Sequence, residues 1–168
     1  MEGSYTQNIG YKVIRKEEEI LGPPWWVAML WNFKCPLKAK LFLLMALLDK
    51  VHVWDSMLRR FWVGLGRCPL FKDRNENVAR LLITCSFIVK MWEFVSTIKG
   101  IHFSWNKQDL SCALQTWVNN MAYKYFFALP IILIWGGWLV RNKSMFEDIY
   151  ITPYVFSSKS LALLNHFP

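Results

Sequence analysis

Cysteine, histidine and acidic residues are all scarce in this chain of 168 residues. It has four cysteines, three histidines, and 12 aspartates and glutamates against 20 lysines and arginines. The acids do not form the paired-carboxylate pattern that a two-metal polymerase or ribonuclease needs. No histidine is spaced to activate a cysteine nucleophile, and the phosphate-loop, hydrolase-elbow and His-Glu-x-x-His motifs are absent from the sequence. The sequence therefore predicts a protein that is not an enzyme.

A secretory signal is also missing. The first twenty residues are polar and contain no apolar core of the kind that such a signal carries. The four cysteines lie far apart along the chain, which does not favour a disulfide framework. We therefore expect an intracellular protein, nuclear or cytoplasmic, with reduced thiols.

Apolar runs fall short of the length that a membrane span requires. The uncharged stretch Tyr125–Val140 has 16 residues, whereas a spanning helix needs about 20. Lys124 and Arg141 close this stretch, and Pro130 lies inside it. We expect a buried apolar helix at about 125–147. The alternative is a small membrane-associated protein anchored by residues 125–140.

Apolar and aromatic residues are abundant. Hydrophobic residues make up 54% of the chain and charged residues 19%, and ten residues are tryptophan. This composition is too apolar for a disordered chain, and the length suits one domain. We predict a mainly α fold: a small single domain over 1–168, with several short helices around an aromatic-rich core.

Helix signals support this prediction. Pro36 is suited to the first turn of a helix over Leu37–Lys50, in which Leu37, Leu41, Leu44 and Leu48 predict an apolar stripe. Asp55 is expected to cap a short helix that ends at Arg59-Arg60. Further helices are expected from Asn75 or Asn77 to Thr84, from Cys85 or Ser86 through Ile98, from Asp109 to about Tyr123, and from Pro130 through Glu147.

Several blocks of the sequence follow a recognisable order. They are Gly3–Ile14, the Trp31…Pro36-x-Lys38-x-x-x-Phe42 run, Trp54–Arg60, Arg67–Cys85, Cys85–Trp92, and the closing Trp135…Trp138-x-x-Arg141-Asn142-x-x-x-Phe146 segment. Together they resemble the reverse transcriptase zinc-binding domain of plant LINE-type (non-LTR) retrotransposon polyproteins. The resemblance covers most of the chain.

This resemblance implies a zinc knuckle at about 67–85 with two of its four ligands replaced. Cys68 and Cys85 occupy thiolate positions, whereas Phe71 replaces a cysteine and Arg80 replaces a histidine. A phenyl ring cannot donate to a metal and a guanidinium stays protonated, so the four donors of a structural zinc site are incomplete. We expect no bound zinc unless distant ligands such as His102 or Cys112 are recruited. Single-base changes explain both replacements, as in a degenerate element copy.

The resemblance and the formal charge of +8 together predict a function. The chain is expected to be a non-catalytic remnant of a retrotransposon polyprotein, with weak and non-specific binding to RNA or DNA phosphates. A translated fragment without a present role is the third alternative. The residues expected to contact phosphates are Lys38, Lys40, Arg59, Arg60, Arg67, Lys72 and Arg74.

Overall fold

The computed structural model describes residues 24–61, 63, 66–70, 76–103, 105 and 109–164, and it divides after Asn32 into two units. In the first unit, helix α2 spans Trp25–Asn32. The first block of the resemblance, Gly3–Ile14, lies outside the described residues.

The second unit begins at Phe33. Its helices are α3 (Leu37–Leu47), α4 (Trp54–Leu58), the π-helix η1 (Arg80–Thr84), α5 (Ser86–Lys99), α6 (Leu110–Asn119), the 3-10 helix η2 (Met121–Phe126), α7 (Leu129–Phe146) and α8 (Pro153–Leu164). The part of the chain that the structure describes contains no β-strand. The predicted mainly α fold is confirmed.

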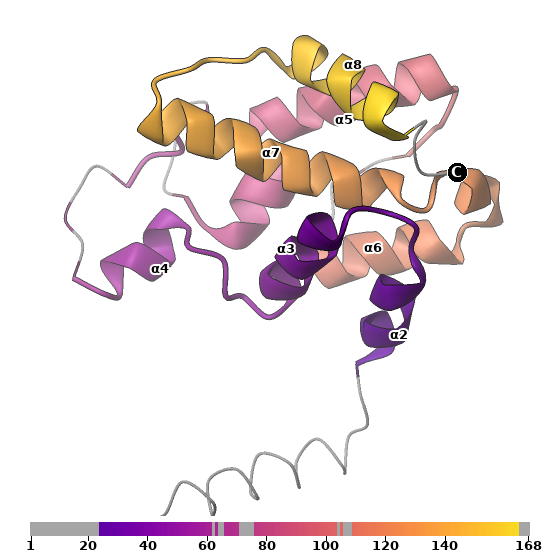
Figure 1. The fold of residues 1–168 in the computed structure, drawn as a ribbon, viewed down its shortest axis with the longest axis horizontal. Coiled ribbons are helices and arrows are strands. Elements are labelled where there is room, and N and C mark those ends of the chain that lie inside the picture. The colour runs from indigo at the N-terminus through magenta and orange to yellow at the C-terminus, as the bar shows by residue number, and fades with distance from the viewer. Residues whose placement is uncertain are drawn as a thin grey trace, which may run out of the picture. The chain divides into compact units, whose positions relative to one another are not determined.

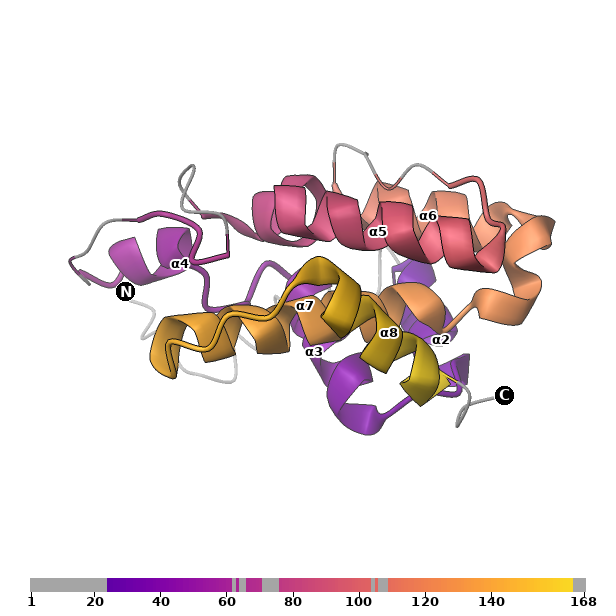
Figure 2. The same ribbon diagram turned by 90° about the horizontal axis from the view of Figure 1, so that it is seen from above.

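Helix α7 is central to the second unit. Figure 1 shows it between α8 on one side and α3 on the other, and α8 also packs along α5. Residues 129–134 of α7 are all buried, as expected for a helix that is covered on several sides. Figure 1 and Figure 2 both place α4 at one end of this unit and η2 at the opposite end.

Two glycines allow the close approach of the helices around α7. A Cβ atom at Gly136 would collide with the Phe156 ring of α8, and a Cβ atom at Gly137 would lie 2.7 Å from Ile88 Cδ1 of α5. A larger side chain at Gly136 or Gly137 would therefore require the Phe156 ring or the end of the Ile88 side chain to move.

The predicted aromatic-rich core is confirmed. Trp92 stacks on Trp105 and Trp117 stacks on Tyr123, each pair with ring centroids 4.5 Å apart. The edge of Phe103 meets Trp117 at 4.8 Å. The polar atoms of two of these rings are paired, because Trp105 Nε1 donates to Leu82 O and the Tyr123 hydroxyl donates to His102 O. Such contacts stabilise the core beyond the burial of apolar area.

The helix caps were predicted in part. Asp109 caps α6, since its carboxylate accepts a hydrogen bond from Cys112 N at 2.7 Å. Asn77 likewise accepts from Arg80 N at 2.7 Å, where η1 begins. The prediction for Asp55 is wrong: the N-cap of α4 is Val53, and Asp55 lies in the first turn. There its carboxylate pairs with Arg59, one turn further on.

The predicted leucine stripe of α3 is also wrong. Leu37, Leu41 and Leu48 are exposed, and the buried face consists of Ala39, Phe42, Leu43 and Ala46. Apolar residues surround this helix on most sides, so their spacing alone does not determine which side is buried. Phe42 fixes the orientation instead, because its ring stacks on Trp138 of α7 at 5.4 Å.

The apolar stretch 125–140 does not form one continuous helix. It includes the end of η2, a turn, and the first part of α7, which begins at Leu129 rather than at residue 125. Among the described residues, no helix combines the length and the apolar character needed to cross a membrane.

Candidate functional site around the knuckle

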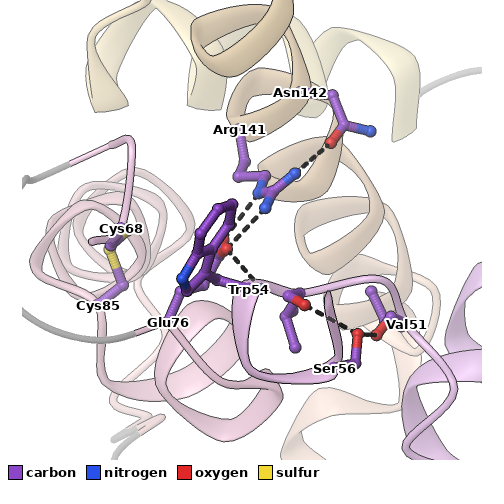
Figure 3. Close-up of polar contacts among 9 residues, drawn as sticks. Val51, Trp54, Ser56, Cys68, Glu76, Cys85, Arg141 and Asn142 are labelled. Carbon is purple, nitrogen blue, oxygen red and sulfur yellow. Dashed lines mark hydrogen bonds and ion pairs between the residues drawn. The ribbon is translucent and has the colours of Figure 1, made fainter. Parts of the chain in front are cut away.

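The two cysteines of the knuckle (residues 67–85) come together in the structure. Cys68 precedes the Pro69-Leu70 turn, and Cys85 lies between η1 and the first residue of α5. Both side chains are buried, with their sulfur atoms 3.8 Å apart (Figure 3). Zinc–sulfur bonds of about 2.3 Å in a tetrahedron put two sulfurs about 3.8 Å apart. The pair therefore keeps the spacing of two zinc ligands.

The chemistry of these thiols is less favourable to a metal. The hydrogen bond with Cys68 raises the pKa of Cys85 well above its ordinary value, and burial raises it further. Zinc binds the thiolate, so both protons would have to leave a buried site before a metal could be held.

The remaining ligand positions do not complete the set. Arg80 is half-buried in η1, and its guanidinium has no lone pair to offer. Phe71 lies outside the described residues. Within the described ranges, no three His, Cys, Asp or Glu side chains are grouped closely enough to hold a metal, so neither His102 nor Cys112 joins the pair. The described residues thus supply two donors where a structural zinc site needs four.

A buried ion pair joins Glu76 of the knuckle to Arg141 of α7. Arg141 Nε donates to Glu76 Oε1 at 2.7 Å, and Arg141 Nη2 donates to Glu76 Oε2 at 2.6 Å. Both side chains are only 1% exposed. The guanidinium also lies 5.0 Å from the centre of the Trp138 ring and donates through Nη1 to Asn142 Oδ1 (Figure 3). Such a two-point pair has a fixed geometry because the planar guanidinium matches a carboxylate.

Glu76 connects four parts of the second unit. Its side chain accepts from Trp54 N at the start of α4, and its carbonyl oxygen accepts from Asp55 N. Its own backbone N–H donates to Gly66 O, just ahead of Cys68. Through Arg141 it is joined to α7, from which Ser144 Oγ also donates to Pro69 O in the knuckle. The first part of the knuckle is thereby attached to α4 and α7 by polar contacts.

Sequence reasoning missed Glu76 as a functional residue. Its signal was weak: Glu76 is one of two acids in a basic, apolar region, and the matching arginine lies far away in the closing block. Nothing in the local spacing indicates that residues 76 and 141 meet, because their contact depends on how α7 packs.

The predicted phosphate-binding residues lie on separate elements. Lys38 is exposed and Lys40 is half-buried, both on α3. Arg59 is exposed but pairs with Asp55 at 3.3 Å. Arg60 is exposed, and its Nη1 lies 2.9 Å from His52 Nε2. Arg67 is exposed beside Cys68, and Lys72 and Arg74 lie outside the described residues. Arg59 and Arg60 are neighbours in the sequence but contact different partners, and the described members lie on separate segments of the chain.

One family model matches this chain. The family is described as zinc-binding in reverse transcriptase, and its match covers residues 5–92. The match includes Cys68, Cys85 and Glu76, whereas Arg141 and the rest of α7 follow it. Neither the curated proteins nor the solved structures gave a match.

Proposed function

Since the chain belongs to the zinc-binding family of reverse transcriptases, we propose that it is a non-catalytic accessory module of a retrotransposon polyprotein that binds nucleic-acid phosphates weakly and without sequence preference. A LINE-type element is the proposed source. The knuckle of this copy is degenerate, and packing and polar contacts replace the complete zinc site.

The observation that carries this proposal is the Glu76–Arg141 pair. It attaches the first part of the knuckle to α4 and α7 from outside, whereas the four ligand positions of the family pattern, all within residues 68–85, would have closed the loop on itself around zinc. The fold around Cys68 and Cys85 can therefore persist although Phe71 and Arg80, which cannot bind zinc, occupy the other two ligand positions.

The charge distribution supports the binding part of the proposal. The chain carries a formal charge of +8, and Lys38, Arg60 and Arg67 are exposed. Arg60 contacts a histidine rather than a carboxylate, so its positive charge is not compensated within that contact. Each phosphate that a cation neutralises releases counterions, and this makes the affinity fall as salt rises.

The test is fluorescence anisotropy with a labelled single-stranded RNA over a series of salt concentrations. Lys38→Glu combined with Arg67→Glu should weaken binding at every salt concentration and reduce the slope of log affinity against log salt by about 0.7 for each lost phosphate contact. The matched control, Lys124→Glu with Lys159→Glu, makes the same change in net charge at exposed positions elsewhere. An equal loss in both double variants would show that net charge alone drives binding, and an unchanged slope in the first would contradict the assignment.

A further inference from the structure

A cavity of about 280 Å³ opens between α4 and the C-terminal half of α7. It is lined by His52, Met57, Arg60, Trp138, Arg141, Asn142 and Phe146. Its volume is just under the range of about 300–1,000 Å³ that is typical of sites for drug-sized ligands. The cavity therefore suits a planar group of one or two rings.

Two aromatic rings form the apolar part of this cavity. Trp138 is held in place by Phe42, which stacks on it, and by the Arg141 guanidinium over its face. Phe146 is 72% exposed at the last residue of α7. Trp138 is thus a fixed wall of the cavity, and the exposed Phe146 ring offers a face on which a flat heterocycle can stack.

The polar groups of the cavity have complementary roles. The charge of Arg141 is compensated by Glu76, whereas Arg60 lies against His52, and within this described lining its charge has no carboxylate partner. Asn142 Oδ1 accepts from Arg141 Nη1, which fixes the amide with its NH₂ group turned away from Arg141 (Figure 3). Among the described residues, the lining contains no aspartate or glutamate. It therefore combines ring faces, an amide donor and a positive charge.

We propose that this cavity binds one unpaired nucleotide of a single-stranded nucleic acid. The base stacks on Phe146 with Trp138 as a side wall, an acceptor on the base takes a hydrogen bond from the Asn142 amide, and the adjoining phosphate pairs with Arg60. This inference rests on the proposed nucleic-acid binding, and it adds that the protein prefers single strands to duplexes. A base within a duplex is stacked and paired, so its faces cannot enter the cavity.

The test compares short single-stranded oligoadenylate with a duplex of the same length, using fluorescence anisotropy. Phe146→Ala removes an exposed ring, so the fold should survive. This variant should weaken single-strand binding by about tenfold, as expected for the loss of one base–aromatic stack, and leave duplex binding unchanged. Arg60→Gln should weaken single-strand binding as well. The control is Tyr125→Ala. It removes another exposed ring, which lies in η2 at the opposite end of the second unit from α4, and it should have no effect.

The outcomes separate this inference from the proposed function. If Phe146→Ala binds single strands like the unmodified chain, or weakens the duplex equally, the cavity is not a nucleotide site. Phosphate binding would still stand if Lys38→Glu with Arg67→Glu reduced the salt slope. If no oligonucleotide binds at low salt, both proposals are wrong. Adenosine monophosphate is the remaining probe. If it saturates the cavity and oligoadenylate does not displace it, the cavity is a site for free nucleotides and the proposed strand binding is wrong.

Discussion

The Glu76 carboxylate and the Arg141 guanidinium meet through two hydrogen bonds of 2.7 and 2.6 Å, although 65 residues separate them in the chain. One partner lies in the knuckle and the other in α7. Because both are buried, neither charge can be solvated by water if the other is removed. The pair is therefore a structural requirement of this fold, whatever the state of the two cysteines.

Removal of one partner is expected to be strongly destabilising. Glu76→Gln leaves the Arg141 charge buried without its counter-charge, and should lower the free energy of unfolding by about 3–5 kcal/mol. Urea denaturation followed by far-ultraviolet circular dichroism would measure this change. A double replacement, Glu76→Gln with Arg141→Met, should recover part of the loss because no isolated charge then remains.

The matched control for this prediction is the exposed pair of Asp55 and Arg59. Its atoms are 3.3 Å apart, but both side chains are more than half exposed. Solvent screening should limit the effect of Asp55→Asn to less than about 1 kcal/mol. Similar losses from Glu76→Gln and Asp55→Asn would contradict the role given to the buried pair.

The contact of α7 with α8 provides a second prediction. Gly136→Ala would place a methyl group against the Phe156 ring, which is buried. We expect a loss of stability of about 1–3 kcal/mol from this overpacking, seen as a lower thermal midpoint. Combination with Phe156→Leu, which makes room for the methyl group, should cost less than the sum of the two single changes. Strict additivity would mean that the two residues do not meet.

The four cysteines should differ in their reaction with iodoacetamide. Cys112 is exposed, whereas Cys68 and Cys85 are buried, and the pKa of Cys85 is raised by its hydrogen bond with Cys68 and by burial. Only the thiolate reacts, so Cys112 should be labelled first and the knuckle pair last in the folded protein. Burial also raises the pKa of the half-buried Cys35, which should react at an intermediate rate. Peptide mass spectrometry over time would establish this order. Rapid labelling of Cys68 or Cys85 would show that the knuckle is open.

The sequence predicted the helices better than their faces. Asp109 and Pro130 marked real helix starts, since a capping carboxylate and a first-turn proline act locally. The buried side of α3 was missed because apolar residues surround it, and the choice depends on the contact of Phe42 with Trp138. Helix α8 was not predicted either.

In the candidate site too, the sequence pattern predicted one contact and left others unpredicted. The approach of Cys68 and Cys85 was expected from the family pattern, in which both positions hold ligands. The contact of Glu76 with Arg141, and the cavity that Arg60 and Phe146 share, depend on how the fold places residue 76 and α4 relative to α7. No local pattern of residues encodes contacts between segments so distant in the chain.

The most direct test of the account is zinc per chain, measured by native mass spectrometry on untagged protein, together with the thermal midpoint with and without a chelator. Two buried thiols with no third donor among the described residues should hold no stoichiometric zinc, and the chelator should leave the thermal midpoint unchanged. One zinc per chain, with a midpoint that falls when the metal is removed, would contradict the claim that the Glu76–Arg141 pair and packing hold the knuckle in place.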